Sequence, residues 1–141
     1  MIQAVAALLA LACLLALAAA MAIDPLACAK PYLRSIAPDE AFSLTVCRRP
    51  MLFAMPGQGS DAPGWAVLRD AGEHVGNVVD VDMVGGIGIA PRWSGWSVEL
   101  PLVAFMDLPP PDRPAWLRWA VDKTWRLRAW LGLVPSSRQF R

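Results

Sequence analysis

The first 23 residues form an apolar run that differs from everything after it. Every position except Gln3 is apolar, and the run ends where Asp24 and Pro25 place a charge beside a helix breaker. At about 1.5 Å per residue, such a helix would be about 33 Å long, and the hydrocarbon core of a bilayer is about 30 Å thick. Residues 1–23 are therefore predicted to be a signal peptide or a transmembrane anchor.

These two interpretations differ in whether the run survives in the mature protein. Ala20-Met21-Ala22 fits the small-x-small rule for signal-peptide cleavage before Ile23, whereas the length of the run suits an uncleaved anchor. The basic residues that usually precede a signal sequence are missing. Lys30 and Arg34 after the run would favour a cytoplasmic C-terminus. We expect export, to an inner-membrane-anchored or periplasmic location.

Residues 24–50 are rich in proline, with Pro25, Pro31, Pro38 and Pro50 spread along them. Proline interrupts regular backbone hydrogen bonding, so we expect short helical turns at most. One such turn is predicted to open at Pro38, with acidic residues behind it. The segment is expected to be a connector between the membrane and a folded domain.

Residues 51–107 contain short apolar runs separated by turn signals. The runs cover residues 51–55, 65–69, 75–84 and 96–104, and no helical period lies between them. The pattern predicts a small antiparallel β domain, as a sandwich or an open barrel.

Two of these runs also predict which side chains share a face. In the third run, Val79, Val81 and Met83 alternate with Asp80 and Asp82. The fourth run carries Pro101, which predicts an edge strand or a bulged strand. The residues expected to share one face of that run are Trp96, Val98, Leu100, Leu102 and Ala104.

After residue 107 the pattern becomes helical. Residues 108–112 are expected to be a stiff Pro linker, and residues 113–132 a helix with Pro114 in its first turn and Gly132 at its end. Residues 133–141 are expected to be a flexible tail. On a helical wheel the apolar side chains fill one arc of about 160°, which leaves Trp125 outside. The arc contains Trp116, Leu117, Trp119, Ala120, Leu127, Trp130 and Leu131.

Composition and charge also distinguish the apolar run, the middle of the chain and the C-terminal helix. The hydrophobic fraction of 56% falls to an ordinary level of about 48% once residues 1–23 are set aside. A length of 141 residues fits one domain and excludes a multidomain enzyme. The net charge of +1 hides an acidic region, residues 1–112 at net −5, and a basic end, residues 113–141 at net +6.

Four of the seven tryptophans lie in that basic end. Basic amphipathic helices with Trp on the apolar face are typical of binding at a membrane surface, and some bind a groove on a partner protein. The alternative is that the helix packs its apolar arc on its own sheet. A membrane-targeting leader argues against nucleic acid as a partner. The surface predicted to meet the membrane or a partner consists of Trp116, Trp119, Lys123, Arg126, Leu127 and Trp130.

Cysteine usage is consistent with export. Cys13 lies inside the apolar run, which leaves Cys28 and Cys47 as an even pair. A bridge between them would close a loop of about 20 residues and stabilise the fold by about 3 kcal/mol. Such a bridge requires an oxidising compartment. We predict a disulfide between Cys28 and Cys47, with two unrelated buried thiols as the alternative.

Catalytic chemistry has little support. His74 is the single histidine, and a Ser60–His74–Asp80 triad would lack the nucleophile-elbow spacing. The acidic residues around Asp80 and Asp82 have no calcium-loop spacing, and no zinc or haem pattern is present. We expect no catalytic residue, metal or cofactor. The Gly- and Pro-rich segment 56–64 is a possible recognition loop through Gln58, Ser60 and Asp61.

Together these features predict a non-enzymatic, membrane-tethered or exported envelope protein. Its expected role is to bind a partner protein or the membrane surface as an accessory or structural component. The alternative is a soluble periplasmic binding or inhibitor module, released by leader cleavage. A small hydrolase that uses His74 is the third possibility.

Overall fold

The computed structural model describes residues 8–15, 18, 24–50 and 62–137. Their regular elements, after the helical residues 8–15, are β1 (Pro31–Ile36), β2 (Phe42–Arg48), β3 (Gly64–Asp70), β4 (Val75–Val81), the 3₁₀ turn η2 (Val84–Gly86), β5 (Arg92–Trp93), β6 (Ser97–Leu100), β7 (Ala104–Asp107) and α2 (Ala115–Trp130). The prediction of a mainly β protein with helical ends is confirmed.

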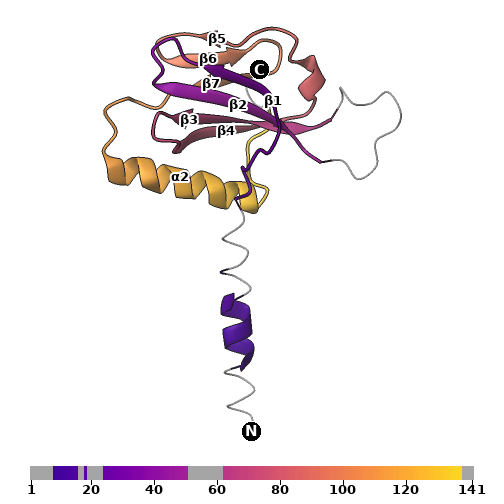
Figure 1. The fold of residues 1–141 in the computed structure, drawn as a ribbon, viewed down its shortest axis with the longest axis vertical. Helices are drawn as coiled ribbons and strands as arrows, with labels where there is room; N and C mark the ends of the chain where they lie inside the picture. The colour runs from indigo at the N-terminus through magenta and orange to yellow at the C-terminus, as the bar shows by residue number, and fades with distance from the viewer. Residues whose placement is uncertain (1–7, 16–17, 19–23, 51–61, 138–141) are drawn as a thin grey trace.

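The strands form two antiparallel sheets, one in the order β1-β2-β3-β4 and the other in the order β5-β6-β7. The four-stranded sheet is the middle layer, with the three-stranded sheet on one face and α2 on the other (Figure 1). The two sheets share one core, which is compatible with the predicted sandwich.

Strands β3 and β4 of the middle sheet are buried on both faces, because their side chains enter two different clusters. In β3, Ala66 and Leu68 join the core between the sheets, while Val67 faces α2 and is fully buried there. In β4, Val79 enters the core between the sheets and Val78 the cluster beneath α2. A strand buried on both sides reads as a continuous apolar run, as the sequence of β3 does.

The prediction that residues 24–50 are only a connector is wrong. They contain β1 and β2, which form a hairpin and supply half of the four-stranded sheet. The expected helical turn at Pro38 is the hairpin turn, in which Glu40 adopts φ 57° and the Asp39 carboxylate accepts the Ala41 N–H. Pro38 lies in the turn itself, where the lack of an N–H does not interrupt the sheet.

The single strand predicted across residues 96–104 is also wrong. Residues Pro101–Val103 form a turn between β6 and β7, with Leu102 at φ 66° and 83% exposed. Val98, Leu100 and Ala104 are buried, whereas Trp96 is exposed. Pro101 therefore ends a strand, because proline suits the central position of a turn.

The predictions for the end of β4 and for the C-terminal tail are confirmed in part and wrong in part. Val79 and Val81 are buried as predicted, but Met83 lies beyond β4 and is exposed. Residues 133–137 are not a flexible tail, because the Pro135 carbonyl accepts the Asp80 N–H and Ser136 forms a bridge with Asp80. The predicted strand of residues 51–55 and most of the loop of residues 56–64 lie outside the described residues.

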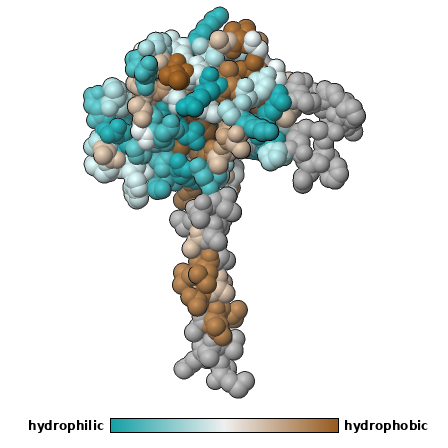
Figure 2. All heavy atoms as spheres, in the orientation of Figure 1, coloured by the Kyte–Doolittle hydropathy of each residue, from teal (hydrophilic) through white to brown (hydrophobic). Residues whose placement is uncertain are grey.

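The apolar run of residues 1–23 is described only in part. Residues 8–15 are helical with exposed leucines, and they lie on the α2 side of the domain (Figures 1 and 2). Within the described residues, no helix has the length and apolar character needed to cross a membrane.

Candidate functional site: the outward face of the C-terminal helix

Helix α2 begins after Pro114 and reaches the end of its hydrogen-bonding pattern at Leu131, with Gly132 at φ 69° in the turn that follows. Glycine adopts this left-handed conformation without a steric cost, which explains the helix end at that point. The helix lies across the four-stranded sheet and contacts β4 in particular.

The side of α2 that packs on the sheet is built around Asp122 and Trp125. Asp122 is 6% exposed and accepts the backbone N–H of Val75 at 3.0 Å. Trp125 packs on the cluster of Val67, Val75 and Val78 and donates its indole N–H to the Gly76 carbonyl at 3.0 Å. We call Asp122, Trp125, Arg126 and Ala129 the inward face.

Gly76 explains why β4 has an acceptor available for Trp125. The register between β3 and β4 shifts between Leu68 and Arg69, which pair with Asn77 and Val75 respectively. Gly76 is the extra residue in this bulge, and its carbonyl accepts the Trp125 indole N–H. The bulge also changes the alternation, so that both Val75 and Val78 face α2.

Arg126 connects the helix to the residue that follows the apolar run. Its guanidinium contacts both carboxylate oxygens of Asp122 at 3.0 Å and one oxygen of Asp24 at 2.6 Å. Burial disfavours the charged form of Asp24, but the hydrogen bonds from Arg126 and from the Leu26 N–H outweigh it, so the pKa of Asp24 lies below its ordinary value. Burial opposes the charge of Arg126 as well, yet the two carboxylates raise its pKa.

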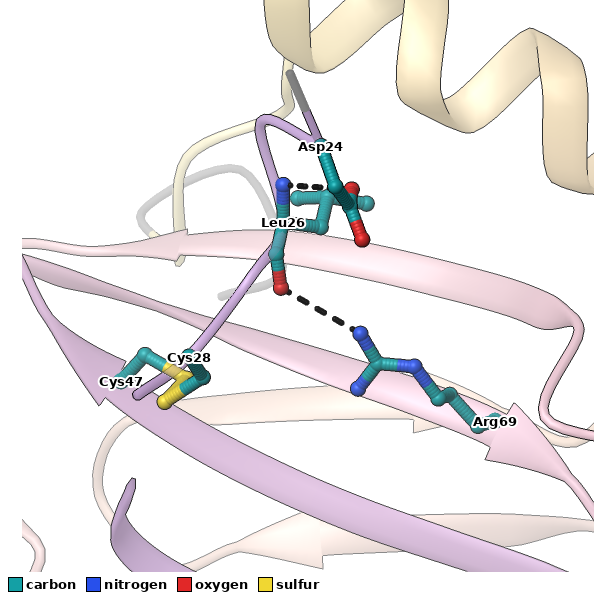
Figure 3. The surroundings of a disulfide bond; sticks show 5 residues. All are labelled: Asp24, Leu26, Cys28, Cys47 and Arg69. Carbon is teal, nitrogen blue, oxygen red and sulfur yellow. Dashed lines mark hydrogen bonds between the residues drawn. A yellow bond between two sulfur atoms is a disulfide. The ribbon is translucent and has the colours of Figure 1, made fainter. Parts of the chain in front are cut away.

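Residues 24–28 are fixed to the domain at three points, and we call them the strap. Asp24 binds Arg126, and Leu26 is 2% exposed in the cluster beneath α2. The Leu26 carbonyl accepts a hydrogen bond from Arg69 at 3.3 Å. Cys28 is bonded to the buried Cys47 of β2, with their Cα atoms 5.9 Å apart (Figure 3).

The predicted disulfide is therefore confirmed, and it indicates an oxidising compartment. It joins the strap directly to the second strand of the middle sheet. Together with Asp24 and Leu26, it leaves no free spacer between the folded domain and the end of the apolar run. The point at which the run meets the domain is thus set by the fold.

The opposite side of α2 is apolar and open to solvent. Trp116 is 69% exposed, Trp119 58% and Leu127 56%, and these side chains belong to the apolar arc predicted from the sequence. The alternative, in which this arc packs on the helix's own sheet, does not hold for these side chains, because the helix packs through the inward face instead. The outward face, as we name it, consists of Trp116, Trp119, Lys123, Leu127, Trp130 and Leu131.

Charge is also divided between the two faces. Asp122 is the only acidic residue among residues 113–132, and it is turned inward. Arg126, which was predicted to belong to the contact surface, is ion-paired to Asp122 and Asp24 on the inward face. Lys123 also lies within 4.0 Å of the Asp122 carboxylate, but its side chain is 57% exposed in the middle of the outward face. Beside this face, the exposed Arg128 lies 5.2 Å from the Trp125 ring centroid.

Among the residues that the structure describes, the remaining candidates form no second site. The predicted recognition residues Gln58, Ser60 and Asp61 lie outside the described residues. Asp80 is paired with Arg49 at 2.8 Å, and His74 contacts Asp70 at 3.3 Å rather than Asp80. Among the described residues there is no metal-binding group of three or more His, Cys, Asp or Glu side chains.

His74 and Asp70 line a hollow of about 180 Å³ near the start of α2. Arg113 and Arg118 also line it, together with apolar side chains and prolines. Within the described part of the chain, the lining includes no Ser, Thr, Cys or Tyr side chain that would act as a nucleophile.

Comparison with known proteins adds no further constraint on the site. No family model, curated protein or solved structure matches this chain.

Proposed function

We propose that this chain is a non-enzymatic, membrane-tethered protein of the cell envelope. Its apolar run remains as an anchor in the inner membrane, and the disulfide-bonded domain lies on the periplasmic side. The domain acts as an accessory or structural component and binds through the outward face of α2.

The observation that carries this proposal is the way the strap is held. The residue after the apolar run, Asp24, is ion-paired to Arg126, and Leu26 is buried beneath α2. A run that only delivers a protein for secretion does not need its junction packed into the mature fold, whereas a permanent anchor benefits from it, because a packed junction restricts the orientation of the domain. The disulfide that follows supports a location in which thiols are oxidised.

The alternative is a soluble periplasmic binding or inhibitor module. Ala20-Met21-Ala22 favours it, because cleavage before Ile23 would leave the whole strap on the mature protein. The same disulfide would then stabilise a released domain.

The two candidates are separated by the mass and location of the native protein. Cells that make the untagged chain are fractionated, the membranes are washed at alkaline pH, and the intact mass and thiol state are determined. We expect a chain that begins at residue 1 or 2, stays in the washed membranes and has Cys28 and Cys47 oxidised. A chain that begins at Ile23 and leaves the membrane in ordinary buffer would establish the alternative. A cytosolic chain with reduced thiols would contradict both.

A further inference from the structure

The outward face of α2 presents an energetic problem in water. Trp116, Trp119, Leu127, Trp130 and Leu131 are each more than half exposed on one side of a single helix. Isolated apolar side chains are common on protein surfaces, but a contiguous stripe of this kind marks an interaction surface. Its occupant has to cover the apolar Trp and Leu side chains and also accommodate the Lys123 ammonium that lies between them.

The position of the strap indicates what covers the outward face. Arg126 of α2 binds Asp24, so the helix lies at the point where the apolar run joins the domain. Residues 8–15 also lie on the α2 side of the domain in Figure 1. An apolar run that enters a bilayer therefore brings α2 close to the surface of the same bilayer, because Asp24 directly follows the run in the sequence.

The side chains of the outward face match the interfacial region of a membrane. Trp prefers the headgroup level, because its ring is apolar and its N–H needs a polar partner. The Lys123 ammonium lies 4.0 Å from the Asp122 carboxylate, and its side chain is 57% exposed on the same side of the helix as these Trp and Leu residues. An exposed lysine can reach anionic phosphates while its methylene stem stays on apolar surface. The only carboxylate of residues 113–132 is buried on the inward face, so no acidic side chain of the helix repels an anionic surface.

We propose that the outward face of α2 docks flat on the bilayer that holds the apolar run, and that it prefers anionic phospholipid. This inference rests on the proposed function, because it takes the run to be a membrane anchor. The docked helix holds the four-stranded sheet above the membrane, and the β5-β6-β7 sheet, on the far side of that sheet, faces the compartment.

Tryptophan fluorescence tests this in the full chain. The apolar run contains no Trp, so all seven tryptophans report on the folded domain and none on the anchor. The chain is reconstituted into vesicles whose acyl chains carry bromine, a short-range quencher of Trp. Vesicles of phosphatidylcholine alone are compared with vesicles that also contain phosphatidylglycerol. We expect strong quenching, greater with phosphatidylglycerol, and a decrease of that difference as salt is raised.

A pair of variants assigns the quenching to the outward face. Leu127→Glu with Leu131→Glu keeps all seven tryptophans and places two acidic side chains on exposed positions of that face. Leu102→Glu with Ile89→Glu makes the same kind of change in exposed loops next to the three-stranded sheet. We expect the first pair to lose more than half of the quenching and the second pair to retain it, with unchanged circular dichroism for both.

The outcomes separate this inference from the proposed function. A chain that sediments with the vesicles but shows no quenching overturns the docking and leaves the anchor in place, and the outward face then belongs to a protein partner. Equal quenching with and without phosphatidylglycerol overturns the anionic preference. A native chain without its apolar run, found by intact mass, overturns the proposed function instead.

Discussion

The two faces of helix α2 use their residues in opposite ways. The inward face holds the helix to its sheet with the buried carboxylate of Asp122 and the indole N–H of Trp125, and it holds the strap through Arg126. The outward face holds most of the helix's large apolar side chains and leaves them exposed. In most surface helices the apolar stripe faces the protein core and the charged side chains face water.

This reversal teaches that the apolar stripe of a helix need not be the part that stabilises the fold. The inward face is held by hydrogen bonds of defined direction: Asp122 accepts from Val75, and Trp125 donates to Gly76. Directional contacts fix the rotation of the helix about its axis, whereas apolar contacts alone fix it less strictly. The outward side chains are then available for another surface.

The largest expected loss of stability comes from replacing a tryptophan of the inward face, and the matched control is a tryptophan of the outward face. Trp125→Ala removes a ring packed on Val67 and Val78 and a hydrogen bond to Gly76, so we expect a loss of about 3 kcal/mol in the free energy of unfolding. Trp116→Ala removes an exposed ring and should change that free energy by less than about 0.5 kcal/mol. Urea titration of the full chain in detergent micelles, followed by circular dichroism, measures both. Similar losses for the two variants would contradict the assignment of the faces.

The disulfide is expected to contribute nearly as much to the free energy of unfolding, because it bonds the strap to β2. Replacing both Cys28 and Cys47 by Ala should lower the free energy of unfolding by about 3 kcal/mol, from the entropy of the opened loop. Cys13→Ala is the matched control, since Cys13 is a free and exposed thiol in the apolar run. The same urea titration applies. An unchanged midpoint for the double variant would mean that the strap is held by Asp24 and Leu26 alone.

Asp122→Ala tests whether the buried carboxylate orients the inward face. The substitution leaves the Val75 N–H without its acceptor and removes one of the two carboxylates that bind Arg126, at an expected cost of about 2 kcal/mol. Asp107→Ala, at an exposed position at the end of β7, should be nearly neutral. If Asp122→Ala proved as stable as Asp107→Ala in thermal unfolding, apolar packing alone would hold the helix.

The smallest expected effect concerns the ion pair at the junction. The pKa of Asp24 is depressed in the folded state, so its contribution is present above the ordinary pKa of the carboxyl and is lost as pH falls through the folded pKa. The pair is partly exposed, so we expect Asp24→Asn to cost about 1 kcal/mol at neutral pH. The difference from the wild type should begin to decrease as pH falls below about 4, and should vanish once pH is below the folded pKa of Asp24. A difference independent of pH would show that charge on Asp24 is not what holds the strap.

Several elements were predictable from the sequence because their signals are local. The β3 strand reads as a continuous apolar run, and the end of α2 carries Gly132 followed by Pro135. The Cys28–Cys47 pair followed from parity once Cys13 was assigned to the apolar run. Five of the six predicted contact residues of α2 lie on its exposed side, and the sixth, Arg126, is drawn inward by Asp24.

Other features were missed although a weaker signal was present. Phe42, Leu44 and Val46 alternate with polar residues in β2, but the prolines on both sides of this strand indicate irregular structure and mask the period of two. On α2, Val121, Trp125 and Ala129 are spaced by four and form a second, narrower stripe. The acceptor for Trp125 had no signal at all, because it is a backbone carbonyl in a bulge.

The sequence by itself determined that the chain has an apolar run at its start, a β-rich middle and a basic helix with an apolar arc. Each of these depends on residues close together along the chain, where periodicity and composition act directly. Only the tertiary structure decided which face of α2 meets the sheet, since that depends on Asp24, Val75 and Gly76, which are distant in sequence from the helix. Their contacts turn the apolar arc away from the core, and a helical wheel contains no information about what lies on either side of the helix.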